Sequence, residues 1–224
     1  GLDEEISDTF EIGYRYQSNQ SFYSEAVLFF TKLQDLVVED NLAGGSGIDE
    51  NAGDVETLGL ELLLGDDLSS YLGTDYRLPV RLAFTYTDAT LDGDIRSASD
   101  SFIFEGDSGN QVPYVPEVQI NFTAGIELKK LSAYANVLYV DERYASALNQ
   151  NAQRDNGDEL DARFGALDAY VTVDLSAFYQ VNDNLEVFAR ASNLFEEKYV
   201  SSRLPLGPRA GAPRLFSAGF TYQF

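Results

Sequence analysis

The sequence predicts an all-β protein, an antiparallel transmembrane β-barrel of about nine strands. Two observations predict it: apolar and polar residues alternate strictly in many segments, and the links between these segments sort into short and long ones. The alternation is clearest at the chain end, where Phe216, Ala218, Phe220, Tyr222 and Phe224 share one face and small or polar residues the other. In water an exposed apolar face of this kind aggregates, whereas in an outer-membrane barrel lipid covers it.

The same period of two recurs along the chain. Residues 117–128 alternate without a break, with Val118, Ile120 and Phe122 opposite Gln119, Asn121 and Thr123. A helix would scatter these residues around its surface, so the period indicates a strand with one apolar face. Further strands with this pattern are predicted at 10–17, 58–64, 80–86, 171–179 and 185–191. Residues 22–31 and 131–140 are also predicted as strands, although apolar residues occur on both faces there in places.

The links between the predicted strands alternate in length. Short links lie near 18–20, 129–130 and 180–184, and long polar links near 34–54, 88–116, 141–167 and 196–212. The link at 65–77 is an exception, because it is longer than a tight turn. Outer-membrane barrels have short periplasmic turns and long extracellular loops. With the C-terminus on the periplasmic side, the long links are therefore predicted to lie outside the cell.

Charged and aromatic residues agree with this orientation. Seven charged residues of the alternating segments fall on the polar face, and an Arg or Lys at the lipid midplane would cost about 2–4 kcal/mol. These residues are Arg15, Glu61, Arg81, Glu127, Asp174, Glu186 and Arg190. Interfacial aromatic girdles are predicted near strand ends, although the β propensity of tyrosine accounts for part of this placement. The tyrosines concerned are Tyr14, Tyr16, Tyr86, Tyr139, Tyr179 and Tyr222.

The composition excludes several classes of function. The chain has no His and no Cys, which removes Ser/His and Cys/His catalysis, disulfides and nearly all zinc sites, so no catalytic residue, metal site or cofactor is predicted. A net charge of −22 argues against nucleic acid as a partner. The acid is concentrated in 35–54, 88–107 and 141–168, which are either solvated loops or sites of cation bridging to lipopolysaccharide.

Two acidic segments have the oxygen density of a calcium loop. They are Asp92-Gly-Asp94 and Asp155-Asn-Gly-Asp-Glu-Leu-Asp161. Neither fits the twelve-residue pattern with its closing Glu. Solvated loops are therefore the favoured interpretation.

The ends of the chain and the strand count predict a fragment. The chain starts at Gly1, contains no Met and shows no export signal, which favours a mature or truncated piece. Nine is an odd number and single-chain bacterial barrels use even numbers, so residues 1–224 are interpreted as one partial domain of a larger barrel. One alternative is a complete small porin or structural barrel of eight or ten strands. Another is a secreted acidic β protein that binds calcium or glycans.

Several short motifs occur in one order along the chain. They are Gly1 to Ser7 followed by Glu11, Gly13, Arg15 and Tyr16; Asn51-Ala-Gly53 with Gly59-Leu-Glu61; Val112 to Glu117; Asn193-Leu-Phe195 with Tyr199; and Arg209 to Arg214. In this order they resemble the C-terminal barrel half of the TonB-dependent outer-membrane receptors, although Glu4 stands where that family often has Pro. The region from Tyr199 to Arg209 is most similar to the ferric-citrate receptor branch.

The resemblance implies a function. It implies a 22-stranded barrel in the bacterial outer membrane, closed by an N-terminal plug, that imports a small-molecule iron chelate such as a siderophore or ferric citrate with energy from the TonB complex. The plug and the segment that contacts TonB are absent from this chain. The terminal strand also resembles the signal read by the barrel assembly machinery, with Phe216, Phe220, Tyr222 and Phe224 as its residues.

The last long link contains the predicted ligand contacts. Arg203, Arg209 and Arg214, together with Lys198, outweigh two neighbouring glutamates. Guanidinium groups bind carboxylates through forked hydrogen bonds, which suits an anionic ferric chelate. Structural bracing of the loop is the alternative role. Similarly, Arg15, Arg81 and Arg190 either attract a chelate or pair with acidic residues of neighbouring strands, of which Glu61, Glu127 and Glu186 are the candidates.

Overall fold

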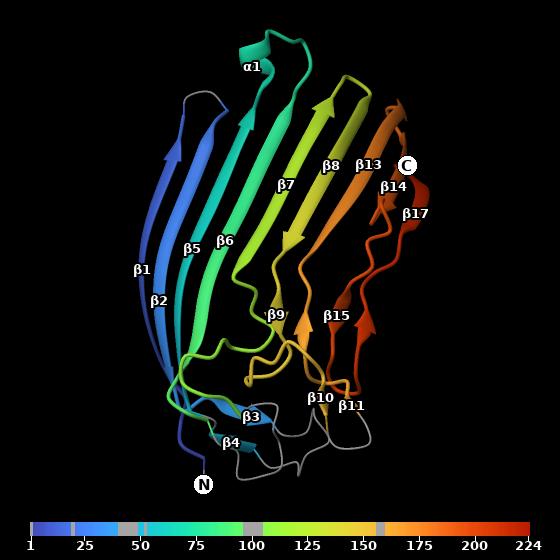
Figure 1. The fold of residues 1–224 in the computed structure, drawn as a ribbon. Coiled ribbons are helices and arrows are strands. Elements are labelled where there is room, and N and C mark those ends of the chain that lie inside the picture. Colours follow the sequence, from blue (N-terminus) through green and yellow to red (C-terminus); the bar gives the residue numbers. More distant parts are fainter. Residues whose placement is uncertain (1, 19–20, 40–48, 52, 96–104, 156–159) are drawn as a thin grey trace.

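The structure, a computed structural model, describes residues 2–18, 21–39, 49–51, 53–95, 105–155 and 160–224. Nine antiparallel strands form one curved sheet in which neighbours in the chain are neighbours in space (Figure 1). The strands are β1 (Ile6–Gln17), β2 (Tyr23–Gln34), β5 (Asp54–Asp67), β6 (Pro79–Asp92), β7 (Val118–Glu127), β8 (Leu131–Val140), β13 (Tyr170–Asn182), β14 (Leu185–Ser192) and β17 (Leu215–Tyr222). All nine predicted strands are therefore confirmed.

The sheet is an open arc. β1 and β17 occupy its two edges and do not pair with each other in the described part of the chain. The order of strands therefore does not correspond to a closed barrel of eight or ten strands. In the described ranges no helix is long and apolar enough to cross a membrane.

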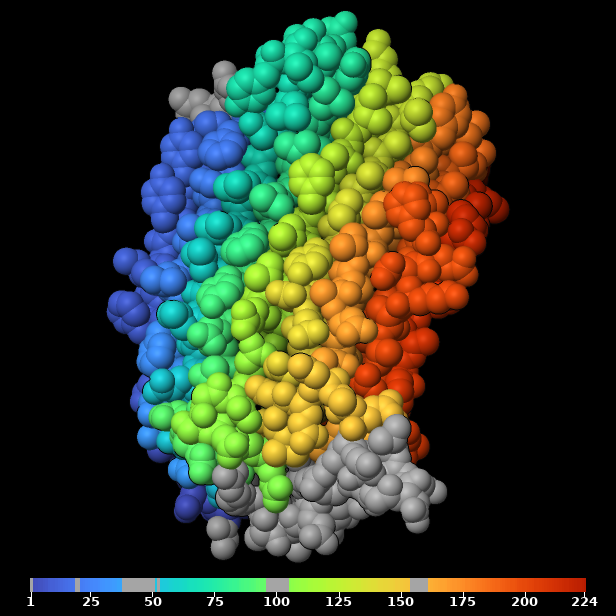
Figure 2. Space-filling model, viewed as in Figure 1, coloured from blue at the N-terminus to red at the C-terminus, as the bar shows by residue number. Residues whose placement is uncertain are grey.

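The register gives the sheet one apolar, outward face. Phe10 of β1 is opposite Phe30 of β2, which is opposite Leu58 of β5, so these side chains form a row across three strands. Their exposed fractions are 69%, 41% and 46%. The same face is exposed at Phe122 of β7 and Phe220 of β17. Figure 2 views this convex face, over which side chains of successive strands form a continuous surface.

The opposite, concave face is polar and contains glycines covered by aromatic rings. A Cβ at Gly59 or Gly65 of β5 would overlap the rings of Phe29 and Tyr23 of β2. The same relationship joins Gly219 to Phe188, where a Cβ would come within 2.7 Å of Cζ. A Cβ at Gly125 of β7 would likewise overlap the ring of Tyr134 of β8, so inward aromatic residues of both β2 and β8 cover a glycine of a neighbouring strand.

Link lengths separate the two rims as predicted. The described residues of the short links 18–22, 128–130 and 183–184 lie at the upper rim of Figure 1, together with the C-terminus. The described residues of the long links 35–53, 93–117, 141–169 and 193–214 lie at the lower rim.

The exceptional link 68–78 at the upper rim contains the short helix α1 (Ser69–Leu72). Asp67 anchors this link by accepting hydrogen bonds from Ser69 N (3.1 Å), Leu78 N (2.9 Å) and Arg77 Nε (2.8 Å). The Asp67 carboxylate and the charge of Glu127 raise the pKa of Arg77.

The buried apolar residues lie at the long-link end of the molecule, in the long links and in the strand ends next to them. Short strand pairs form there: β3 (Val37–Glu39) with β4 (Asp49–Asn51), β9 (Arg143–Tyr144) with β12 (Ala166–Leu167), β10 (Arg154–Asp155) with β11 (Leu160–Asp161), and β15 (Val200–Ser202) with β16 (Arg209–Ala210). Phe164 and Leu167 are completely buried, and Val55, Leu91, Ile95 and Ala147 form a second cluster. Most strand residues face lipid or the barrel interior, so the buried side chains of the described residues gather at this end of the sheet, where the links cover the strand ends.

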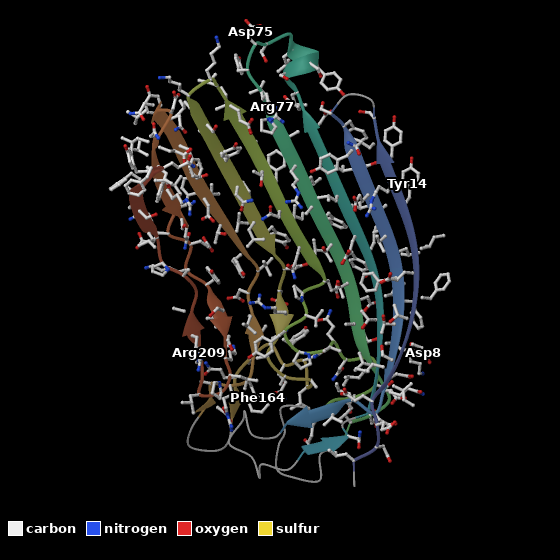
Figure 3. All side chains as sticks on the ribbon, turned by 180° about the vertical axis from the view of Figure 1, so that it is seen from behind. Asp8, Tyr14, Asp75, Arg77, Phe164 and Arg209 are labelled. Carbon is white, nitrogen blue, oxygen red and sulfur yellow. The ribbon has the colours of Figure 1, made fainter. Side chains whose placement is uncertain are left out.

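One part of the girdle prediction is wrong. Tyr86 lies in the middle of β6, because that strand continues to Asp92 beyond the start of β7. The other predicted girdle tyrosines are within four residues of a strand end, and all six lie on the outward face. Figure 3 shows Tyr14 pointing away from the sheet.

Candidate functional site

Three long links are joined into one cap at the lower rim, and this cap is the candidate functional site. Gln111 N donates to Asn149 Oδ1 at 2.6 Å, and Asn149 Nδ2 donates back to Gln111 O at 2.9 Å, which ties 93–117 to 141–169. Tyr114 N donates to Tyr144 O at 2.8 Å. The backbone N of Arg203 donates to the hydroxyl of Tyr114 at 3.1 Å. This hydrogen bond joins the last long link, 193–214, to the cap.

Asn193 anchors the last long link to the sheet. Its side chain donates to Glu197 O and Ala212 O, both at 2.9 Å, and accepts from Glu197 N at 2.8 Å. Its backbone N donates to Asp174 Oδ1 at 2.7 Å, and its φ of 46° lies in the left-handed region that Asn tolerates. The Asn193-Leu-Phe195 motif therefore has a structural cause: one side chain closes both ends of the loop.

Tyr199 continues this arrangement. Its ring lies over the backbone of Gly211, where a Cβ would overlap it, and it stacks on Tyr170 with centroids 3.9 Å apart and an interplanar angle of 13°. The guanidinium carbon of Arg143 lies 5.7 Å from the centroid of Tyr170. A cation, two stacked rings and a glycine are thus brought together from β9, β13 and the last link.

Arg143 is the residue of this site whose environment is most unusual. Its exposed fraction is 7%, and its Nη2 donates to Ser201 O at 3.4 Å. Within the described ranges its Nη1 has no hydrogen-bond partner, and neither has the buried hydroxyl of Ser146. A buried guanidinium without a carboxylate is costly, so the surroundings of Arg143 favour an anion.

The three predicted ligand residues occupy different environments. Arg203 donates from Nε to Ala166 O (3.1 Å) and from Nη1 to Ala162 O (3.3 Å), so it links the cap. Arg214 forms an ion pair with Glu196 at 3.0 Å and lies beside the ring of Phe216. Arg209 is exposed on β16, and Figure 3 shows it at the same end of the molecule as Phe164. Bracing thus accounts for the contacts of Arg203 and Arg214.

The arginines on the concave face pair differently from the prediction. Arg15 forms an ion pair with Glu25 of β2 at 2.8 Å, because these two residues are directly opposite in the register. Arg190 lies over the rings of Phe178 (5.5 Å) and Phe188 (5.1 Å). Glu127 pairs with Arg77 at 2.9 Å. None of the three predicted acidic partners therefore forms an ion pair with these arginines among the described residues.

The two acidic segments have other partners. Asp92 pairs with Lys32 at 2.6 Å, and Asp94 Oδ1 accepts from Ser108 N at 3.1 Å, which closes the turn. Residues 156–159 lie outside the described residues, and Asp161 pairs with Arg163 at 2.7 Å. The hydrogen bonds that Arg163 donates to Asp161 raise the pKa of Arg163. Across the described ranges no three acidic residues form a group that could hold a metal ion.

Sequence reasoning missed Arg143, Tyr114 and Asn149. Arg143 lies in a stretch that is notable for its acid, and its burial depends on contacts with residues distant in the chain. The positive φ of Tyr114 (65°) and of Asn149 (50°) has no sequence signature in an irregular loop.

Comparison with known families decides the relationship of this chain. Residues 1–194 match the family described as TonB dependent receptor-like, beta-barrel. The chain belongs to the TonB-dependent receptor family. Members of this family are bacterial outer-membrane proteins, so the apolar face of the sheet lies in lipid. The interpretation as a secreted acidic β protein is therefore wrong.

Two relatives of this chain in the family have different names. The chain is 25% identical over 205 residues to the probable TonB-dependent siderophore receptor PiuA of Acinetobacter baumannii, a match covering 88% of this chain and 24% of that protein. It is 39% identical over 79 residues to the vitamin B12 transporter BtuB of Photobacterium profundum, covering 34% of this chain and 12% of that protein. The chain thus spans about a quarter or less of the length of these receptors.

Solved structures show the same fold. The crystal structure of PiuA from Acinetobacter baumannii has a TM-score of 0.72 at 22% identity and covers 96% of this chain and 28% of its own. The unliganded ferric citrate transporter FecA has a TM-score of 0.74 at 18% identity, covering 96% of this chain and 31% of its own. The nine-stranded sheet is therefore a part of a larger barrel.

Proposed function

We propose that this chain is the C-terminal barrel part of an outer-membrane receptor that imports a ferric chelate, a siderophore or ferric citrate, by TonB-dependent active uptake. The named relative that is similar over most of the chain is a probable siderophore receptor. The region from Tyr199 to Arg209, which resembles the ferric-citrate receptor branch, lies in the loop of the cap that Asn193 anchors. A plug segment outside these residues would contact TonB.

The observation that carries this proposal is the surroundings of two arginines in the cap. Elsewhere in the described ranges Lys32, Arg15 and Arg77 each pair with a carboxylate, as Arg163 does within the cap. In contrast, Arg143 is buried beside the ring of Tyr170, which stacks on Tyr199, and the side chain of Arg203 bonds backbone carbonyls. In a chain with a net charge of −22, two cap arginines without a carboxylate among the described residues favour an anionic ligand.

Arg209 and Arg214 complete the proposed contact surface. Arg209 is exposed, and Arg214 is 42% exposed although it pairs with Glu196. We assign first contact with the chelate to Arg209. Arg203 contributes to the ligand surface by holding the cap in place.

Two further partners belong to this proposal. Phe216, Phe220 and Tyr222 share the outward face of β17, and Phe224 lies against Tyr222 with centroids 5.3 Å apart. This aromatic end of the chain is proposed to be read by the barrel assembly machinery. Lipopolysaccharide is the proposed lipid partner at the long-link rim, where outward carboxylates such as Asp92 and Glu56 surround Lys32.

Uptake by cells that carry the full-length gene tests the proposal. We expect Arg209→Ala to weaken binding of the imported ferric chelate about tenfold, since a hydrogen bond to a charged group contributes about 1.5–3 kcal/mol. Lys130→Ala, on the short link at the opposite rim, is the matched control. Uptake of cobalamin but of no ferric chelate would overturn the proposed substrate class, and uptake that is unchanged in Arg209→Ala would remove the assigned contact.

A further inference from the structure

The outward face contains a groove across the last five strands of the sheet. Its volume is about 610 Å³, and its walls come from β7, β8, β13, β14 and β17. Six alanines line it, together with the larger side chains of Ile126, Leu175 and Phe216; the alanines are Ala124, Ala133, Ala135, Ala177, Ala189 and Ala191. The register places Ala133 opposite Ala177 and Ala177 opposite Ala189, so a row of methyl groups crosses three adjacent strands.

Larger side chains border the groove on both sides. Toward the long-link rim, Phe122 is opposite Val137, which is opposite Val173. Toward the short-link rim, Tyr179 is opposite Val187, which is opposite Phe220. The groove is therefore a recess in the apolar surface between two bulky rows. Figure 2 shows this outward face, on which β7 is yellow-green and β17 red.

The position of the groove in the sheet sets its depth in the membrane. Ala133 is two residues from Leu131, the first residue of β8, and Ala189 is four residues from Leu185, the first of β14. Both strands begin at the short-link rim, which is the periplasmic side. The groove therefore lies in the periplasmic half of the membrane-facing surface.

The dimensions of the groove correspond to one hydrocarbon chain. Four spacings between five strands, at about 4.8 Å each, give a length of about 19 Å. With strands tilted by about 45°, a groove perpendicular to them covers about 13 Å of depth, which is close to one leaflet of a hydrocarbon core about 30 Å thick. A recess of this kind, continuous with the lipid interface and lined by methyl groups, recognises only an apolar occupant.

We propose that this groove is a seat for one acyl chain of a periplasmic-leaflet phospholipid. The chain packs against the alanine row and contacts the larger lining side chains Ile126, Leu175 and Phe216. The seat holds this lipid more firmly than a flat part of the apolar surface does, because a recess brings more apolar area into contact with the chain. This proposal is independent of which ligand the receptor imports.

A groove-filling variant of the full-length receptor tests the proposal. Ala177→Phe fills the middle of the groove, and Ala26→Phe adds the same side chain to the outward face of β2, outside the groove. Each protein is reconstituted with phosphatidylethanolamine, exchanged into detergent, and its retained phospholipid is counted by native mass spectrometry. We expect the unchanged receptor and Ala26→Phe to retain one phospholipid, and Ala177→Phe to bind it about tenfold more weakly.

The other outcomes contradict the proposal. Equal retention by all three proteins would show that the groove holds no particular lipid. Loss of a dimer in Ala177→Phe, with no change in retained lipid, would instead make the groove an interface with a second barrel. Thermal unfolding of both variants checks that each is folded, and Ala177→Leu supplies a smaller filling side chain if the Phe variant is not.

Discussion

The ring of Phe29 on β2 lies over the backbone of Gly59 on β5, where any Cβ would overlap it. These residues are directly opposite each other in the register and point to the concave side. The ring takes the place of the missing side chain, so the two strands approach without a gap. The relationship explains a glycine in the middle of a strand, a position that glycine usually destabilises.

Gly59→Ala is expected to destabilise the barrel by about 1–3 kcal/mol, because the new methyl group displaces Phe29. Gly13→Ala is the matched control: it also faces inward, but its Cβ would meet Val27 at 3.7 Å in ordinary contact. Urea unfolding of the full-length receptor in lipid measures both. Equal stability of the two variants would contradict the role of Phe29, and Gly59→Ala combined with Phe29→Ala should recover part of the loss.

Asn193→Ala should release the last long link. Three side-chain hydrogen bonds are lost, and Ala at φ 46° adds backbone strain, so the expected cost is about 2–4 kcal/mol for the docked loop. Asn193→Gly removes the same hydrogen bonds without the strain and should lose about 1 kcal/mol less. Limited proteolysis within 196–212 reports docking. A loop that stays protected in both variants would show that other contacts hold it.

Arg143→Met separates a ligand role from a structural one. Arg143 is a buried guanidinium that pairs with no carboxylate among the described residues, so its removal should leave the thermal stability of the ligand-free receptor unchanged or raise it, because Met fills a similar volume without a charge. Affinity for an anionic ferric chelate should fall about tenfold. Differential scanning fluorimetry and chelate binding provide the two measurements. A large loss of stability with unchanged affinity would assign Arg143 to bracing alone.

Asp67→Asn should loosen the link that carries α1. The carboxylate of Asp67 is 14% exposed and accepts two backbone N–H groups and Arg77 Nε, so its neutralisation should weaken these three hydrogen bonds. Faster amide hydrogen exchange at residues 68–78 would report this change. Asp75→Asn, in the same exposed link, should leave exchange as it is. Similar exchange in both variants would contradict the anchoring role of Asp67.

Leu60→Arg tests which face of the sheet meets lipid. Leu60 lies on the outward face of β5 opposite Tyr86, so an Arg there should cost about 2–4 kcal/mol in lipid. Thr85→Arg places the same group on the inward face opposite Glu61 and should be close to neutral. Unfolding in lipid compares the two variants. A larger loss for Thr85→Arg would reverse the assignment of the faces.

The strands and their faces were predictable because a period of two is a local property. Alternation over 10–17 or 117–128 needs no distant contact, and the membrane selects which face is apolar. Link lengths also identified the two rims, because the length of a link can be read along the chain without knowledge of any distant contact. Tyr86 shows the limit of this reasoning, because its position relative to the strand end depends on how far β6 extends beyond β7.

The candidate site was predictable only in part. The charge pattern indicated that Arg203, Arg209 and Arg214 belong to one loop, but not that Ala162 and Ala166 supply carbonyls to Arg203. Arg143 and Tyr170 are 27 positions apart, and Tyr170 stacks on Tyr199 only after the links 141–169 and 193–214 fold together. Contacts between irregular loops follow from side-chain packing and have no periodic signal in the sequence.

The sequence by itself determined that this protein is a membrane-facing antiparallel sheet, which side of each strand meets lipid, and where its loops begin. Only the tertiary structure decided which loop residues are buried, which cations lack a carboxylate, and where the outward surface is recessed. The physical reason is that strand pattern depends on neighbours two residues away, whereas burial and charge pairing depend on residues that the fold brings together.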